Sequence, residues 1–236
     1  MRKPLVALTI AAAAVPMLIG IAGLPRPGDP SAAVHTHVAA RYIARGAHET
    51  GADNLVTGVL LNYRAFDTFG EVMVIFTALA AVMAVLPRGA TAPPGGGAAP
   101  RIPISPIVAF IIRLTAPFIA VFGAFVIFKG HVSPGGGFQG GVILGALLMM
   151  LSLVLGRGLD RPLLPARSAR WLQAAAPLAF FAVGMLGLGL TGAVLGYPAE
   201  PGRELLRELM MLLLEIGIGV GGGAIILGLF LETRGE

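Results

Sequence analysis

Three glutamates approach and enter the last long apolar run of the chain. Glu204 and Glu208 precede the middle of that run, and Glu215 lies inside it. At 100° per residue the three fall within about 40° of one another on a helix, so they predict a carboxylate stripe descending into a membrane span. A carboxylate in a span is costly and usually faces a partner or water, which makes Glu215 a candidate station for protons or cations. The alternative for the upper two is a solvated helix end neutralised by Arg203 and Arg207.

A glycine-rich string, Gly130-His-Val-Ser-Pro-Gly-Gly-Gly-Phe-Gln-Gly-Gly141, is the second feature that could carry chemistry. It has no Gly-Lys-Ser/Thr ending and no preceding strand, which excludes a phosphate-cradling loop. One interpretation is a tight turn whose glycines permit positive φ and close helix approach. The other is a hydrated path lined by exposed carbonyls with His131 and Gln139, since irregular backbone at membrane depth is tolerated only beside protein or water.

Two further charged sites lie in apolar runs. Asp67-Thr-Phe-Gly-Glu71 opens the second run. It predicts either a helix-capping box or a cation or proton station at Glu71, with Asp67 beside it. Arg113 lies inside the third run, where it either snorkels to the membrane surface or pairs with an acid of this chain or of a partner.

Composition places most of the chain in a membrane. The sequence is 56% hydrophobic and 12% charged, against roughly 25% charged residues in soluble domains. A helix needs about 20 mainly apolar residues to cross a bilayer core. The sequence therefore predicts an all-α integral membrane protein of about six transmembrane helices, at Pro4–Leu24, Gly70–Leu86, Ile107–Phe128, Phe138–Leu155, Trp171–Leu195 and Leu209–Leu231. The first run is too long for a signal-peptide core of roughly 7–15 residues, and no Ala-x-Ala site follows it.

The spans divide into a group of two and a group of four. The stretch 91–103 is rich in glycine, proline and alanine, which predicts a flexible linker between a module at 1–90 and a module at 104–236. The first module contains a long outer loop, Pro25–Phe69, with a weak helical pattern over Val38–Gly58. The short loop Arg157–Arg170 holds four arginines and places both chain termini in the cytoplasm. Overlapping glycine pairs in the last run predict tightly docked neighbouring helices.

Several functions are excluded by composition. The chain has no cysteine, so it carries no disulfide, cysteine-ligated iron–sulfur cluster or thiolate zinc site. No metal site or cofactor is expected, although sodium is a possible transported ion. The basic residues do not form a nucleic-acid-binding stripe. No nucleophile, base and orienting group are grouped as a stand-alone enzyme requires.

Two strings resemble known families. Asp67–Glu71, preceded by Thr50–Asn54 and Asn62–Phe66, resembles the E-type subunit of membrane-bound hydrogenases and the C-terminal end of the large A-type subunit of Mrp-type sodium/proton antiporters. The string 130–141 and its four flanking spans are similar to the MnhB (MrpB) subunit of the same antiporters. Asn62 departs from the family pattern, which has an aspartate there. Glu71 matches the glutamate of the first family, and the second string is matched by His131, Pro134, Gly135, Gly136, Gly137, Phe138, Gly140 and Gly141.

The resemblance implies a non-redox subunit of a multisubunit complex in the cytoplasmic membrane of a bacterium or archaeon. Its expected partners are A- and D-like proton-channel subunits, small C-, E-, F- and G-like subunits, and lipid. Three functions remain open: a part of the cation path of a cation/proton antiporter, the same module in a redox-driven complex such as a membrane-bound hydrogenase, or an assembly scaffold without an ion path.

Overall fold

The fold is helical throughout the part of the chain that the structure describes. The computed structural model describes residues 2–85, 104–155, 166–198 and 200–234. Every element in these ranges is a helix, as the sequence predicts. The predicted linker 91–103 lies outside the described residues, as do Arg157 and Arg161 of the arginine-rich loop.

Five helices are long and apolar enough to cross a membrane, and a bent pair supplies a sixth span if it counts as one. The pair consists of α8 (Ala166–Gln173) and α9 (Ala175–Thr191), which meet at an angle of 46°. This confirms a multi-pass membrane fold with the predicted number of spans. The five single spans are α1 (Arg2–Ala22), α5 (Ala65–Val85), α6 (Pro106–Phe128), α7 (Gly137–Leu155) and α10 (Glu204–Arg234).

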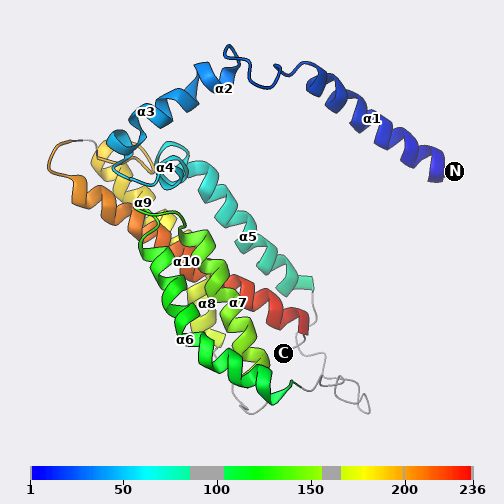
Figure 1. Cartoon of the computed structure of the whole chain (residues 1–236), viewed down its shortest axis with the longest axis vertical. Coiled ribbons are helices and arrows are strands. Elements are labelled where there is room, and N and C mark those ends of the chain that lie inside the picture. Colours follow the sequence, from blue (N-terminus) through cyan, green and yellow to red (C-terminus); the bar gives the residue numbers. More distant parts are fainter. Residues whose placement is uncertain (1, 86–103, 156–165, 199, 235–236) are drawn as a thin grey trace. The chain divides into compact units, whose positions relative to one another are not determined.

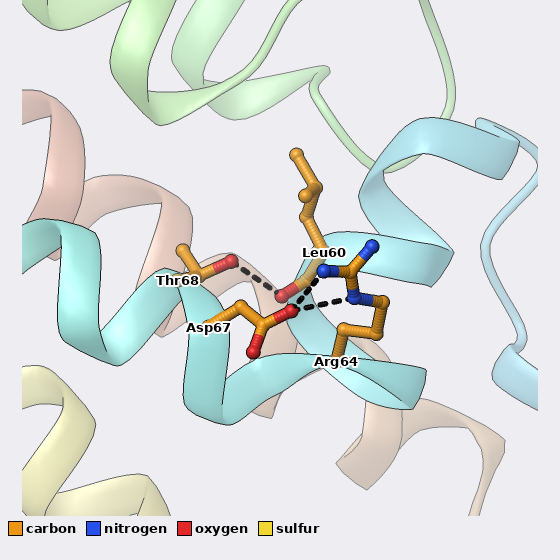
Figure 2. Close-up of polar contacts among 4 residues, drawn as sticks. All are labelled: Leu60, Arg64, Asp67 and Thr68. Atoms are coloured by element: carbon orange, nitrogen blue, oxygen red, sulfur yellow. Dashed lines mark hydrogen bonds and ion pairs between the residues drawn. The ribbon is translucent and has the colours of Figure 1, made fainter. Parts of the chain in front are cut away.

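The second span begins earlier than the sequence predicts, at Ala65 rather than Gly70. A short helix α4 (Leu55–Gly58) continues into a π-helical turn η1 (Val59–Tyr63), and Arg64 then leaves the helical conformation with φ −127° and ψ 38°. The Thr68 hydroxyl donates a 2.7 Å hydrogen bond to the Leu60 carbonyl across this junction, as Figure 2 shows. Such π-helical turns occur frequently at functional sites.

The early start removes the predicted capping box. Asp67 lies in the first turn of α5 instead of at its N-cap, and Glu71 lies one turn further on. The Asp67 carboxylate instead accepts a 2.5 Å hydrogen bond from Nε of Arg64, which also pairs with it through Nη2 (Figure 2). The capping-box interpretation is therefore wrong, because the Arg64 junction fixes the helix start upstream of it.

The chain forms two compact units, residues 1–44 and 45–236. The first unit contains α1, the short helix α2 (Ala33–Thr36) and the beginning of α3 (Val38–Thr50). Within its own unit, α1 buries none of its span. The helix α3 forms within the segment where the sequence predicts a weak helical pattern.

The second unit is built around α10. This helix contacts α5, α6, α7, α8 and α9, and 61% of its span is buried, against 17–33% for α5, α6 and α7. Figure 1 shows α6 and α7 running alongside each other, with α10 adjoining them. Buried apolar side chains from η1, α5, α9 and α10 form the core, among them Leu61, Val72, Phe180, Met210 and Leu214.

The glycines of α10 lie on two packed faces. A Cβ added to Gly221 would lie 2.9 Å from the backbone nitrogen of Ala176 in α9. A Cβ added to Gly141 of α7 would lie 2.9 Å from the carbonyl oxygen of Gly219 and 3.4 Å from the nitrogen of Gly223. The backbones of α7 and α9 thus approach α10 as closely as small-xxx-small pairs permit, which confirms the prediction of tightly docked neighbours.

Candidate functional site

Glu215 is the most deeply buried carboxylate among the described residues. It lies on α10 with 3% of its surface exposed. Burial of a carboxylate inside a span requires hydrogen-bond donors that replace water. The loop between α6 and α7, residues 129–136, forms part of the surroundings of the Glu215 carboxylate, and the segment leading into α5 forms the rest.

The first donor is the beginning of α7. Gly137 is the first residue of that helix, and its backbone N–H donates a hydrogen bond to Oε2 of Glu215. The N-terminus of a helix carries a partial positive charge and unpaired N–H groups, so it favours a carboxylate at this place. The start of α7 therefore stabilises the charged form of Glu215.

The glycine run exists because the loop backbone lies directly against the carboxylate. A Cβ on Gly130 would lie 2.7 Å from Oε1 of Glu215, and a Cβ on Gly136 would lie 3.0 Å from Oε2. Gly135 and Gly136 also adopt φ values of +132° and +144°, which side-chain-bearing residues rarely adopt. We call the residues Gly130, Gly136 and Gly137, together with Thr57, the Glu215 clamp.

The second donor comes from a distant part of the chain. Thr57 of α4 is buried, and its Oγ1 lies 3.2 Å from Oε1 of Glu215 and 2.7 Å from the carbonyl oxygen of Gly130. Asn54 caps α4 through its Oδ1, and its Nδ2 donates to the carbonyls of Gly130 (2.7 Å) and Ser133 (2.9 Å). The Asn54 backbone N–H donates to the carbonyl of His131 at 3.0 Å.

These contacts join the two signature strings of the sequence. Asn54 ends the string that begins at Thr50, and it lies against the glycine-rich string 130–141. Sequence reasoning assigned no role to Asn54 or Thr57. The one local signal was an asparagine immediately before an apolar stretch, which is an N-cap pattern. Nothing in that pattern identifies a partner 158 residues away.

The clamp accommodates both protonation states of Glu215. The Thr57 hydroxyl has one proton and two acceptor lone pairs. When it donates to the Gly130 carbonyl and accepts a hydrogen bond from one of the two amide N–H groups of Asn54, its remaining lone pair can accept a hydrogen bond from the O–H of a neutral Glu215. When Glu215 is charged, Thr57 can donate to it instead, while Gly137 donates in either case. A proton can thus enter or leave without leaving a buried polar group unpaired.

Next to the clamp, His131 connects Glu215's surroundings with the surface. The His131 side chain is buried, and its Nε2 lies 3.0 Å from Oε1 of Glu208, whose side chain is 49% exposed. The other ring nitrogen, Nδ1, is buried and has no hydrogen-bond partner among the described residues. Glu208 lies two turns before Glu215 on α10, about 10 Å along the helix axis. His131 therefore lies on the stripe that the three glutamates predict.

Tyr197 adds a second buried polar group near the clamp. Its hydroxyl is buried and finds no partner within the described part of the chain. Burial, and secondarily the charge of Glu215, raises the pKa of Tyr197. The phenol therefore keeps its proton.

Arg203 and Arg207 do not form ion pairs with Glu208, as the sequence suggests they would. Arg203 pairs with Glu200 at 3.4 Å. Arg207 is buried, and its Nη1 donates to the backbone carbonyl of Glu49 at 3.3 Å, because α3 ends against this face of α10. Glu208 pairs with His131. The interpretation of Glu208 as part of a solvated helix end neutralised by arginines is therefore wrong.

Other predicted residues lie outside the clamp. Glu204 is exposed at the start of α10, where it accepts a 3.1 Å hydrogen bond from the Gly202 N–H. The remaining ones have exposed side chains on the surface of this chain, namely Asp67 and Glu71 on α5, Arg113 on α6, and Gln139 on α7. Among the described residues, no group of three or more histidine, aspartate or glutamate side chains is placed to hold a metal ion.

Comparison with known families agrees with the two signature strings. Residues 107–231 match the family model described as a domain related to the MnhB subunit of the Na+/H+ antiporter. The chain belongs to this family. Residues 7–96 match a second model, which describes the E-type subunit of MBH. A chain with both parts therefore combines an MnhB-type module with an E-type module.

Two curated relatives match over most of the chain. The A/B-type subunit of a probable K+/H+ antiporter of Rhizobium meliloti is 26% identical over 81% of this chain but only 20% of its own length. An uncharacterised protein of Methanocaldococcus jannaschii is 25% identical over 71% of each chain. The chain thus spans about a fifth of the antiporter relative.

Two solved structures share the fold. A chain of the membrane-bound sulfane sulfur reductase, an archaeal respiratory membrane complex, is 29% identical with a TM-score of 0.67, and the match covers 97% of this chain and 98% of that one. A chain of the Mrp complex from Dietzia is 24% identical with a TM-score of 0.58, covering 94% of this chain and 26% of that one. The protein is a multi-pass membrane protein that is similar to subunits of antiporter and respiratory membrane complexes.

Proposed function

We propose that the chain is a non-redox subunit of a multisubunit sodium/proton or related cation/proton antiporter in the cytoplasmic membrane of a bacterium or archaeon. Within it, Glu215 is the buried station that takes up and releases the transported proton. The observation that carries this proposal is the Glu215 clamp, which offers hydrogen-bond partners to both the charged and the neutral carboxyl group.

The route to Glu215 begins at the half-exposed Glu208. A proton from Glu208 passes to Nε2 of His131, and Nδ1 of the same ring gives it up on the buried side. The 3.0 Å contact between Glu208 and Nε2 and the unpaired Nδ1 support this direction. An imidazole that carries its proton on Nδ1 can accept one on Nε2 and release the first, and the ring must then return to its starting tautomer before the next transfer. Glu204 attracts cations at the mouth of the route.

Glu71 serves as a second station, at an interface with another subunit. Its side chain is exposed on α5, roughly 9 Å along the helix from Ala65. An exposed carboxylate at that depth requires a polar neighbour, which a partner subunit supplies. Asp67 remains near the entrance of this station, and Arg113 on α6 pairs with an acid of a partner subunit. The partners are antiporter-type A-, C-, D-, E-, F- and G-like subunits.

A redox-driven complex is the second candidate. The match with a chain of the sulfane sulfur reductase extends over almost the full length of both chains and has the higher TM-score. In that case the chain performs the same ion movement, but cysteine-bearing partner subunits drive it. The clamp is compatible with both functions. The subunit composition of the purified complex therefore decides between them, because only a redox-driven complex requires cysteine-bearing partner subunits.

Substitution of Glu215 tests the proposed function. Glu215→Gln keeps the size of the side chain and its ability to accept from Gly137, but it cannot carry a proton on and off. In membrane vesicles that contain the whole complex, we expect cation-dependent proton movement to be abolished or reduced at least tenfold. The complex should still assemble, as judged on native gels.

The matched control is Glu204→Gln on the same helix. Because Glu204 is exposed and screened by salt, its loss should raise the half-saturating cation concentration only mildly. An assembled Glu215→Gln complex that exchanges ions at the parental rate would refute the proposal. If Glu71→Gln also assembles and exchanges ions at the parental rate, the chain is an assembly scaffold and the ion route runs through a partner.

A further inference from the structure

Arg207 holds the end of α3 against α10. It is buried, with 7% of its surface exposed, although it lies in the first turn of α10. Its Nη1 donates a 3.3 Å hydrogen bond to the backbone carbonyl of Glu49, in the last turn of α3. The final carbonyls of a helix carry a partial negative charge, which favours a cation at this place. Arg207 therefore binds the main chain of α3 where that helix ends.

Gly51 allows the chain to leave α3 in direct contact with Arg207. It has a left-handed conformation with φ +76°, and its N–H donates a 2.8 Å hydrogen bond to the carbonyl of Ala47. Glycine is the usual residue for such a helix end, because a side chain is strained at positive φ. A Cβ on Gly51 would also lie 3.2 Å from Nε of Arg207 and 3.5 Å from Cζ. The guanidinium group thus packs on the backbone that follows α3.

The end of α3 also packs against α4, the helix that carries Thr57. Thr50 is the last residue of α3, and a Cβ on Gly58 of α4 would lie 2.6 Å from its Oγ1. A Cβ on Gly46, one turn earlier, would lie 2.5 Å from Cδ1 of Leu55. Because both contacts are this close, a shift of the end of α3 is passed on to α4.

On its other side, α4 reaches Glu215. Oγ1 of Thr57 lies 3.2 Å from Oε1 of Glu215, and Asn54 holds α4 on two carbonyls of the α6–α7 loop. Arg207 and Glu215 lie on the same helix, eight residues or about 12 Å apart along its axis. The segment from α3 to α4 therefore contacts α10 at two points, one at Arg207 and the other at Glu215.

We propose that Arg207 is a positioning residue for Glu215. By holding the end of α3 on α10, it sets the approach of the Thr57 hydroxyl to the buried carboxyl group. It acts through Thr57 and not as a ligand of that group. Its consequence for transport rests on the proposed function, in which Glu215 takes up and releases a proton.

Infrared spectroscopy of the purified full chain reports on this geometry without any transport. Difference spectra between acid and alkaline pH contain the carbonyl stretch of the neutral Glu215 carboxyl group, which is the band that is missing in Glu215→Gln. This stretch moves to higher frequency when the carboxyl group loses a hydrogen bond. We expect Arg207→Gln and Thr57→Val to shift the band upward alike. Arg207→Gln should add no further shift to Thr57→Val, because both changes remove the same contact.

Two variants serve as controls. Arg203→Gln should leave the band in place, because that guanidinium group pairs with Glu200 and is half exposed. Arg207→Lys keeps a charged donor for the Glu49 carbonyl and should restore the parental frequency. An unchanged band in a folded Arg207→Gln chain would overturn the proposal. A further shift when Arg207→Gln is added to Thr57→Val would overturn it as well.

Gly51→Ala disturbs the same contact from the other side, and it replaces Arg207→Gln if that variant is not monodisperse. Its methyl group requires a strained φ and lies 3.2 Å from Nε of Arg207, so the band should again move to higher frequency. An unchanged band in Gly51→Ala would overturn the proposal. If the band shifts as expected but Glu215→Gln exchanges ions at the parental rate, the proposed function fails and the positioning role of Arg207 stands.

Discussion

Two adjacent glycines of α10 give opposite predictions for the same substitution. A Cβ on Gly221 would lie 2.9 Å from the Ala176 nitrogen and 3.0 Å from its Cβ, whereas a Cβ on Gly222 meets no atom within 4 Å. Both residues are helical, so replacement by alanine adds the same intrinsic helix propensity, about 1 kcal/mol. The difference between Gly221→Ala and Gly222→Ala therefore isolates the packing of α10 against α9.

The size of that difference follows from the distances. Ordinary contact begins at 3.4 Å, so α9 and α10 must separate by about 0.5 Å to admit the new methyl group of Gly221→Ala. Its nearest neighbour is backbone, which cannot turn aside as a flexible side chain can. Overpacking of this kind costs about 1–3 kcal/mol. For a chain of this length, a loss of about 1–3 kcal/mol corresponds to a thermal unfolding midpoint of Gly221→Ala roughly 2–12 °C below the midpoint of Gly222→Ala.

Thermal unfolding of the purified full chain in a mild detergent measures the pair. We monitor the fraction that remains monodisperse after heating, for both variants and the parental chain. Gly222→Ala should equal or exceed the parental midpoint, and Gly221→Ala should fall below it. Equal midpoints for the two variants would refute the close α9–α10 packing.

Three further outcomes are expected. Thr57→Val should slow cation-dependent proton movement in vesicles roughly 10- to 100-fold, because it removes a hydrogen bond that is worth about 1.5–3 kcal/mol to a charged group. Thr57→Ser should restore the rate, and an unaffected rate in Thr57→Val would contradict the clamp. His131→Gln should reduce the rate of proton movement more strongly than Glu208→Gln, since Glu208 is half exposed and water can replace its side chain. The reverse order would contradict the proton route through His131. Cysteines introduced at Ser133 and Ser168 should be labelled by an impermeant thiol reagent from opposite sides of the membrane, with position 133 reached from outside. Labelling of position 168 alone in intact cells would invert the predicted orientation.

The sequence is a good guide to what is local along α10. Glu215 stands out because a carboxylate in an apolar run is rare, and the spacing of the glycines at 217, 219, 221 and 223 is enough to predict two packed faces. The observed faces pack against α9 and α7, whereas the spacing predicts close packing against a neighbouring helix without identifying it. The start of α7 at Gly137 likewise falls within a residue of its predicted start.

Two features could not be predicted because distant residues determine them. The clamp depends on Thr57, which is 158 residues from Glu215, and no local pattern specifies such a contact. The start of α5 depends on the π-helical turn η1, which the Thr68 hydroxyl stabilises by pairing with Leu60 eight residues earlier. A capping pattern at Asp67 was therefore overridden by an irregular turn that sequence periodicity does not show.

The central claim is that Glu215 gains and loses a proton during exchange. Infrared difference spectroscopy on the purified complex tests it most directly, because the carbonyl stretch of a neutral carboxyl group is resolved from that of a carboxylate. We record spectra as the transported cation is added at constant pH. The account predicts that a buried carboxyl band disappears on cation addition, and that this change is absent in Glu215→Gln but present in Glu204→Gln. An identical difference spectrum in the parental and Glu215→Gln complexes would contradict the claim.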